Sequence, residues 1–228
     1  MTVAERLSEV RARIATAASA AGRDPGDITL VAVSKEVDID AVVEAADAGQ
    51  RDFGENRAQE LEKKVVALET MPALPFAPAW HFIGRLQRNK IKSVAGAVTL
   101  WQSVDRTQIG EAIARHAPGA RVLVQVNVGG EEQKGGCEAR EAPGIVESLT
   151  RLGLRVEGLM TVPPQLGDPR PHFAALRDLA TGLDLRTLSM GMSGDFEAAI
   201  SEGATVVRVG TAVFGARRPG AGQPDLRR

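Results

Sequence analysis

The hydrophobic and polar positions at the start of the chain have the spacing of an amphipathic helix. Apolar residues recur at intervals of three and four and form one stripe, at Val3, Leu7, Val10, Ile14 and Ala17. Thr2 and Glu5 have the spacing of a capping box, and Gly22 is a suitable helix end. The pattern therefore predicts a helix that begins beside Thr2 and ends near Gly22.

From residue 28 the pattern changes to that of a buried strand. Residues 28–34 are mostly apolar or β-branched, and the first charge after them is Lys35. A short apolar run of this kind is typical of a strand that is covered on both faces in a parallel sheet. We therefore expect a strand at 28–34 with Lys35 at its carboxyl end.

Strand and helix patterns then alternate through the rest of the chain. Strands are expected at 28–34, 51–54, 80–84, 98–104, 121–128, 155–162, 187–192 and 206–209. Helices are expected at 38–48, 57–68, 88–94, after an Asp105 cap, around Ile145 and Leu149, at 173–183 and after a Ser193 cap. Pro143 and Gly144 predict either a late start or a kink in the helix that carries Ile145.

Eight strands separated by helices imply right-handed crossovers and a parallel sheet, which is the α/β class. The number of units predicts a single TIM-type (β/α)8 barrel with an extra N-terminal helix, covering residues 1–216. The alternative is an open doubly wound sheet, but no G-x-G-x-x-G follows the first strand. Residues 217–228 are rich in proline and glycine, and we expect them to be a disordered tail.

Composition narrows the function classes. The chain has 228 residues and a formal net charge of −1, which argues against a nucleic-acid partner or a polybasic membrane patch. No apolar run is long enough to cross a bilayer, and residues 1–20 do not have the pattern of a signal peptide. Cys137 is the one cysteine, so no intramolecular disulfide can form, and we expect a cytoplasmic protein. The histidines lack metal-ligand spacing, and we expect no metal site.

Lys35 is the first candidate for chemistry. The carboxyl ends of the strands are where α/β proteins keep their ligands. Partial shielding from water disfavours the ammonium form, and a lysine that loses its proton readily can form a Schiff base with a carbonyl group. The alternative is a surface lysine at the start of a loop.

The ends of the last two expected strands predict an anion site. Ser193 and Gly194 follow one strand, and Gly210 and Thr211 follow the next. Each pair offers a hydroxyl group and a glycine that allows backbone amides to approach a ligand. In a barrel, the ends of strands seven and eight are a frequent phosphate site. The alternative is that Ser193 is only a helix cap and Gly210 only a turn.

Other polar residues leave more than one interpretation open. Arg208 lies among valines, so it needs a partner if it is buried, unless it faces the surface. Glu55 could pair with a cation, and Asn56 could contact a ligand or cap a helix. His81 is better explained as a core histidine than as a proton shuttle. Cys137 follows glycines and could be exposed, with nothing beside it to mark a nucleophile.

A lysine suited to a Schiff base, a phosphate cradle and a buried arginine together suggest pyridoxal 5′-phosphate (PLP). The chain also resembles the pyridoxal phosphate homeostasis protein family from about residue 28 to residue 215. The resemblance rests on VAVSK at 31–35, FGENR at 53–57, WHFIG at 80–84 with Leu86-Gln87 and Asn89-Lys90, GLMT at 158–161, SMGMS at 189–193 and VRVG at 207–210.

The resemblance implies a barrel related to the N-terminal domain of alanine racemase, with PLP held as an aldimine on Lys35. It further implies phosphate contacts at Ser193, Gly194, Gly210 and Thr211, and ring contacts near Asn56 and Arg208. It implies a protein that binds PLP and supplies it to apo PLP-dependent enzymes, without a dedicated catalytic activity and without catalytic residues.

Two other functions stay open. The first is a PLP-dependent racemase or decarboxylase of the alanine racemase-like type. Such racemases use a tyrosine from a second domain, whereas this chain contains no tyrosine and we expect no such domain after the barrel. The second is a Schiff-base aldolase, which would bind no chromophore. We expect a monomer. The basic stretch 85–92 is either a solvated helix, which we favour, or a second phosphate site.

Overall fold

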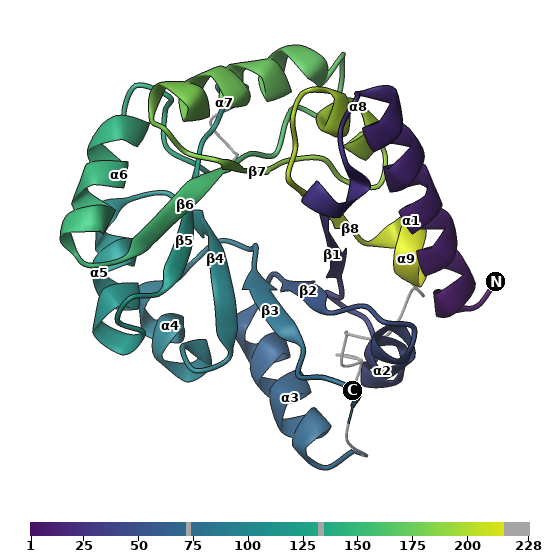
Figure 1. Ribbon diagram of the computed structural model, residues 1–228. Coiled ribbons are helices and arrows are strands. Elements are labelled where there is room, and N and C mark those ends of the chain that lie inside the picture. The colour runs from purple at the N-terminus through teal and green to yellow at the C-terminus, as the bar shows by residue number, and fades with distance from the viewer. Residues whose placement is uncertain (72–73, 132–134, 217–228) are drawn as a thin grey trace, which may run out of the picture.

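Eight parallel strands close into a barrel in chain order, so that β1 pairs with both β2 and β8. The computed structural model describes residues 1–71, 74–131 and 135–216. A ring of helices surrounds the strands (Figure 1). The predicted (β/α)8 barrel is confirmed and the open doubly wound sheet is wrong. The tail predicted at 217–228 lies outside the described residues.

The strands and helices have the following bounds. The strands are β1 (Thr29–Val33), β2 (Asp52–Glu55), β3 (Ala79–Phe82), β4 (Val98–Val104), β5 (Arg121–Gln125), β6 (Arg155–Met160), β7 (Thr187–Ser189) and β8 (Val206–Val209). The helices are α1 (Val3–Ala20), a 3-10 turn η1 (Pro25–Asp27), α2 (Ile39–Asp47), α3 (Ala58–Glu69), α4 (Arg88–Val94), α5 (Thr107–His116), α6 (Ala142–Arg151), α7 (Arg170–Gly182), α8 (Phe196–Ser201) and α9 (Thr211–Phe214).

The extra N-terminal helix is present and begins as predicted. Thr2 and Glu5 form the capping box, in which the Thr2 hydroxyl accepts from the Glu5 amide and the Glu5 carboxylate accepts from the Thr2 amide. The buried stripe of α1 packs beside α8, α9 and α2 (Figure 1). The helix therefore covers the outside of the barrel where β8 meets β1.

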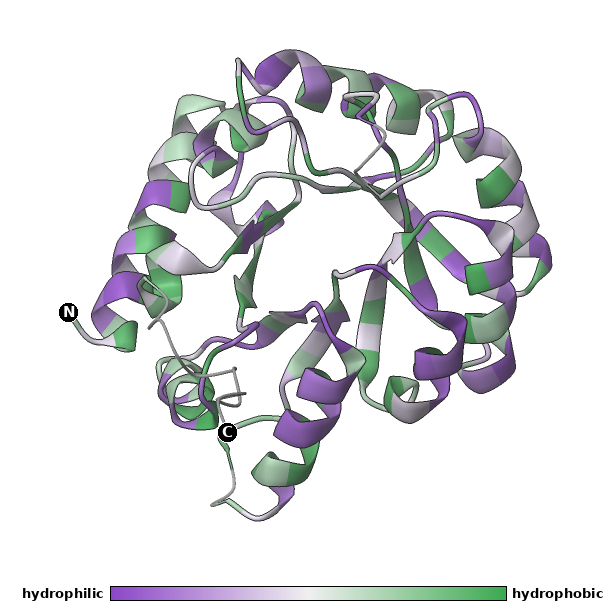
Figure 2. Cartoon of the chain, turned by 180° about the vertical axis from the view of Figure 1, so that it is seen from behind, coloured by the Kyte–Doolittle hydropathy of each residue, from purple (hydrophilic) through white to green (hydrophobic). Residues whose placement is uncertain are grey.

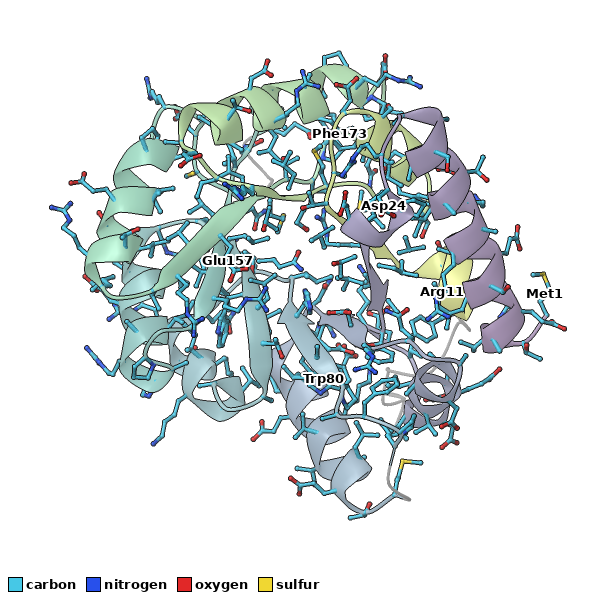
Figure 3. The ribbon with its side chains drawn as sticks, in the orientation of Figure 1. Met1, Arg11, Asp24, Trp80, Glu157 and Phe173 are labelled. Atoms are coloured by element: carbon cyan, nitrogen blue, oxygen red, sulfur yellow. The ribbon has the colours of Figure 1, made fainter. Side chains whose placement is uncertain are left out.

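Each strand has one row of side chains facing the helices and one facing the barrel interior. The outward row, with residues such as Phe53 and Trp101, joins the helices in the main hydrophobic core. The inward row contains a small separate apolar cluster of Leu100, Leu123 and Met160. The helix ribbons alternate between hydrophilic and hydrophobic colours along their length (Figure 2). Side chains extend from the strands into the space that the ribbon leaves open (Figure 3).

Several strands end earlier than their apolar runs predict. The strands expected to end at residues 128, 162 and 192 end at Gln125, Met160 and Ser189. The apolar character continues because residues just past these ends, such as Val126 and Met190, are still buried. Hydrophobicity reports burial and does not mark where a regular strand ends, which explains the difference.

Two of the predicted helix caps are wrong. Arg106 is the N-cap of α5, and the Asp105 carboxylate pairs with the Arg106 guanidinium at 2.5 Å. α8 begins at Phe196 after Asp195, whose carboxylate accepts from the Met192 amide, so Ser193 is not the cap. In α6, Pro143 lies in the first turn, which confirms that the proline marks the start of the helix. α9 was not predicted.

The helices of the described residues include none that is long and apolar enough to span a membrane.

Candidate ligand site at the mouth of the barrel

Lys35 lies at the carboxyl edge of the barrel, two residues after β1 ends at Val33. It is partly buried and sits in a turn that the Val37 amide closes on the Ser34 carbonyl at 3.0 Å. The next residue, Glu36, has φ 58°, a left-handed conformation that is uncommon for a residue with a side chain. The lysine is therefore held in a specific turn at the edge where barrels bind ligands.

A buried ion pair between α3 and the end of β2 holds that turn in place. The Lys64 ammonium on α3 donates to the Glu55 carboxylate at 2.6 Å and to the Ser34 carbonyl at 2.5 Å. The Ser34 hydroxyl also donates to Glu55, at 2.6 Å. Burial raises the pKa of Glu55 from its usual value, while Lys64 opposes that rise. The predicted pairing of Glu55 with a cation is confirmed, and the pair holds the backbone next to Lys35.

The two predicted glycine-hydroxyl turns meet at the ends of β7 and β8. The Ser193 hydroxyl accepts a hydrogen bond from the Gly210 amide at 3.3 Å. Gly194 follows in the same turn, and a Cβ built on it would meet nothing within 4 Å. Thr211 is exposed and is the first residue of α9. The structure thus brings these four predicted residues into one region, with open space in front of Gly194.

Gly191 shapes the entry to this region. It has φ +93°, and a Cβ there would lie 2.6 Å from the Cβ of Ala199 and 2.9 Å from the Cα of Phe196. Only glycine combines that backbone conformation with such close packing on α8. The Gly191 carbonyl accepts from the Arg208 amide at 2.9 Å, so this glycine ties the β7 end to β8.

Arg208 is buried in the barrel interior, with 4% of its surface exposed. Its guanidinium donates to the Ser189 hydroxyl through Nη1 and to the Thr161 carbonyl through Nη2, both at 2.7 Å. Burial lowers the pKa of Arg208 to about 10, and the carboxylate of Asp195 opposes that change. The prediction of a partner is confirmed and the surface-facing alternative is wrong. Since both partners are neutral, a further acceptor or an anion beside the guanidinium would stabilise its buried charge.

A chain of hydrogen bonds supports Arg208 from the far side of the barrel. Ser189 donates to the Gln102 carbonyl at 2.6 Å, and the Gln102 amide lies 2.6 Å from His81 Nδ1. His81 Nε2 lies 3.0 Å from the Asp52 carboxylate. Because the Gln102 side-chain oxygen accepts from Ser189, the Gln102 NH2 group is the one that faces His81 and donates to Nδ1. The ring proton of His81 is therefore on Nε2. His81 is therefore the buried core histidine that was predicted.

Asn56 lies where β2 leads into α3. Arg57 and not Asn56 is the N-cap of α3, so the helix-cap interpretation is wrong. Among the described residues, the buried Oδ1 of Asn56 has no hydrogen-bond partner. A buried acceptor without a partner is costly, which is consistent with a polar ligand group at this position.

Gly84→Ala is expected to displace Asn56 and destabilise the fold. A Cβ at residue 84 would overlap the backbone oxygen of Asn56 and lie 2.6 Å from its Cα. Overpacking against backbone costs about 1–3 kcal/mol or more. Urea denaturation followed by circular dichroism checks this, with Gly96→Ala as the control because a Cβ there meets nothing within 4 Å. Equal stability of the two variants would contradict the packing argument.

Cys137 is buried, with 5% of its surface exposed, so the expectation of an exposed thiol is wrong. Its amide donates to the Gln125 carbonyl at 2.9 Å, and its carbonyl accepts from the Asn127 amide at 2.8 Å. These bonds draw the segment under the end of β5. Burial, and to a smaller extent the Glu141 carboxylate, raises the pKa of the thiol to about 12.

The folded protein is therefore expected to resist thiol alkylation. With a pKa of about 12, only about 10⁻⁴ of the Cys137 thiol is ionised at pH 8. Native protein and guanidinium-unfolded protein should differ by more than about 100-fold in their rates of reaction with iodoacetamide. Comparable rates would show that Cys137 is accessible in the folded state.

Sequence reasoning missed Gln102, Ser189, Asp52 and Lys64. The available signal was a polar residue inside an apolar strand, as at Gln102 and Ser103 between Trp101 and Val104. Lys64 gave no such signal because it lies on a helix with many charged neighbours.

The fold and the placed residues match one class of protein: barrels related to alanine racemase, here with a lysine after the first strand and two glycine-hydroxyl turns after the last two. The family model described as alanine racemase, N-terminal domain, matches residues 6–218. The pyridoxal phosphate homeostasis proteins of Pseudomonas aeruginosa and Aquifex aeolicus are 46% and 44% identical to this chain. Each alignment covers 96% of this chain. It covers 98% of the Pseudomonas aeruginosa protein and 100% of the Aquifex aeolicus protein.

A solved structure gives the same result. PipY of Synechococcus elongatus, in a structure with PLP bound, is 33% identical with a TM-score of 0.80, and the match covers 94% of this chain and 100% of PipY. The chain belongs to the pyridoxal phosphate homeostasis protein family.

Proposed function

We propose that the protein binds PLP at the mouth of the barrel, keeps it in reserve and supplies it to apo PLP-dependent enzymes. The observation that carries the proposal is the joint placement of Lys35, the Ser193–Gly210 contact and the buried Arg208 around the carboxyl ends of β1, β7 and β8. Membership of a family whose relatives are named for PLP homeostasis, and the PLP in the PipY structure, support it.

The residues present fit this cofactor. Lys35 offers an amine for the aldehyde, and Ser193, Gly194, Gly210 and Thr211 offer hydroxyl and amide groups for the phosphate. The partnerless Asn56 Oδ1 can accept from a polar group on the ring. When bound, PLP supplies an aldehyde and an electron-withdrawing pyridine ring. In this proposal the Ser193 hydroxyl, which accepts from the Gly210 amide, would be one of the groups that hold the phosphate.

Arg208 suits a carrier better than an enzyme. In our proposal its guanidinium would help to hold the ring by donating a hydrogen bond to the pyridine nitrogen. A cation at that position disfavours protonation of the ring, and an unprotonated ring is a weaker electron sink for carbanion chemistry. The hydrogen bonds from Arg208 to Ser189 and Thr161 hold the guanidinium in place and keep it from moving away.

The described residues also lack a convincing second base for racemisation. Both ring nitrogens of His81 are engaged, by Gln102 and by Asp52. Cys137 is buried with a pKa of about 12. The chain contains no tyrosine. We therefore propose that the protein has no dedicated catalytic activity, and we rank a racemase or decarboxylase second.

The absorbance spectrum of protein incubated with PLP tests the proposal. We expect a visible band that borohydride removes while it fixes the cofactor onto the peptide containing Lys35. We further expect activity to return when the loaded protein is mixed with an apo PLP-dependent enzyme, and no loss of the α-hydrogen from amino acids. Absence of the band would contradict PLP binding and favour an aldolase, whereas rapid α-hydrogen exchange would contradict the carrier.

The state and place of action are part of the same proposal. We propose that the protein acts as a monomer in the cytoplasm. A chain with one cysteine has no intramolecular disulfide that a reducing environment could break. Light scattering of the loaded protein tests the monomer.

A further inference from the structure

A cavity lies on the outer side of the barrel mouth, between α3 and α4. These two helices are neighbours in the ring (Figure 1). The cavity has a volume of about 260 Å³. Its walls come from the start of α3, the loop after β3 and α4, with Asn56, Arg57, Ala58, Gln59, Phe82, Arg85, Leu86, Gln87, Lys90, Ile91 and Val94 as lining residues.

Three cations line this cavity without an acidic partner. Arg57, Arg85 and Lys90 make no ion pair or side-chain hydrogen bond within the ranges that the structure describes. No aspartate or glutamate is among the lining residues. Some arginines elsewhere have acidic partners, as Arg177 has Glu202 and Arg13 has Glu197. The cavity therefore has a positive potential that nothing in its wall neutralises.

The floor of the cavity has the opposite character. Phe82, Leu86 and Ile91 are each buried and contribute apolar surface, together with Ala58 and Val94. Gln59 and Gln87 add amide groups at the rim. A site with an apolar floor and a basic rim suits a ligand with an apolar body and an anionic end. At about 260 Å³ the cavity is slightly smaller than the roughly 300–1,000 Å³ of drug-sized sites.

We propose that this cavity is a second, non-covalent binding site for a small phosphomonoester with an aromatic or aliphatic body. A phosphate dianion matches three cations better than a carboxylate does, because it offers more charge and three acceptor oxygens. The cavity does not include Lys35 or the Ser193–Gly210 contact, and it shares only Asn56 with the residues proposed to contact PLP. It also gives a role to the basic segment after β3, whose outward residues Arg88 and Lys92 are exposed.

Titration calorimetry with phenyl phosphate tests the proposal on PLP-loaded protein, in which the first phosphate position is filled. The key variant is Arg85→Gln with Lys90→Gln. The matched control is Arg88→Gln with Lys92→Gln, which removes the same charge from the same segment outside the cavity lining. We expect one saturable site in the wild type and in the control. In the key variant, affinity should fall about 10-fold or more, because two charge-assisted contacts are lost.

Two comparisons identify what is recognised. Inorganic phosphate should bind more weakly than phenyl phosphate, because it lacks the apolar body, and phenol should not compete. An equal loss of affinity in the key and control variants would overturn the proposal, since it would indicate only attraction to positive charge. Binding that occurs in PLP-free protein and disappears on loading would also overturn it, since the ligand would then occupy the first site.

Arginine modification tests the same site without any substitution. Phenylglyoxal reacts with accessible arginines, and peptide mass analysis reports each position. We expect phenyl phosphate to protect Arg57 and Arg85 and to leave Arg88 unprotected. Lys35→Ala should retain this protection, which separates the result from PLP binding. Protection of all three arginines, or of none, would overturn the proposal.

Discussion

Lys35→Arg is expected to remove the covalent attachment of PLP and to weaken its retention by about 100-fold, which corresponds to about 2.7 kcal/mol. Arginine keeps a positive charge at the turn after β1, but its guanidinium does not lose a proton at working pH and cannot bond to the aldehyde. The remaining contacts, at the ends of β7 and β8 and at Arg208, would hold the cofactor only by hydrogen bonds and charge. Equilibrium dialysis with PLP and mass analysis after borohydride reduction measure both effects.

The control for this prediction is Lys92→Arg, at an exposed position on α4. It should leave the visible band and the affinity unchanged. The circular dichroism spectrum of Lys35→Arg should match that of the wild type, because Lys35 lies outside the strand and the turn around it is held by Lys64 and Glu55. An affinity within about twofold of the wild type would show that Lys35 is not the anchor.

The barrel could be predicted because its signals are local. Each strand pattern is short and apolar, and a helical pattern separates it from the next. Few folds are compatible with that alternation. The proximity of the two glycine-hydroxyl turns could be predicted for a related reason. Ser193-Gly194 and Gly210-Thr211 each carry their own signal, and barrel topology makes the ends of strands seven and eight neighbours. The hydrogen bond between Ser193 and Gly210 agrees with that reasoning.

The interior hydrogen bonds could not be predicted because they join distant parts of the chain. Ser189 and Gln102 are 87 positions apart, and their contact depends on how the strands are staggered around the barrel. The exposure of Cys137 was predicted wrongly for the same reason. Its neighbouring glycines suggest an open loop, but a bridge to Val126 places the thiol under the end of β5.

α9 lay beyond the reach of periodicity because it has four residues, too few to show a helical repeat. Helix caps were also assigned from residue type alone. Ser193 has the side chain of a good cap, yet it faces Gly210 across the site, and Asp195 takes the position before α8. A hydroxyl near a helix start can serve a ligand site as readily as a cap, and the sequence alone does not distinguish the two.

Lys64→Met is expected to destabilise the fold by about 3–5 kcal/mol at pH 8, since it leaves a buried carboxylate without its cation. The carboxylate of Glu55 is fully buried, and it would keep only the hydrogen bond from Ser34. Release of the Ser34 carbonyl would also loosen the turn that carries Lys35. We therefore expect PLP affinity to fall by about 10-fold in the same variant. Urea denaturation and equilibrium dialysis measure the two effects.

The loss of folding stability in Lys64→Met should become larger as pH rises. Burial already raises the pKa of Glu55 above its value of 4.5 in an unfolded chain, and removal of Lys64 takes away the largest opposing effect, so the pKa rises further. Above pH 4.5 the folded state then binds more protons than the unfolded state, and stability falls as pH rises through the folded pKa. The difference in the free energy of unfolding between Lys64→Met and the wild type should accordingly be smaller at about pH 5 than at about pH 8.

A second substitution separates charge from packing. In Glu55→Gln with Lys64→Met no buried charge remains, while the carbonyl of the introduced glutamine can still accept from the Ser34 hydroxyl. The double variant should regain most of the lost stability and lose the added pH dependence, because replacing both members of a buried pair costs far less than breaking it. Lys63→Met, an exposed neighbour on α3, should change stability by less than about 0.5 kcal/mol. If Lys64→Met and Lys63→Met were equally stable at pH 8, Glu55 would not need Lys64, and the turn that carries Lys35 would be held by other contacts.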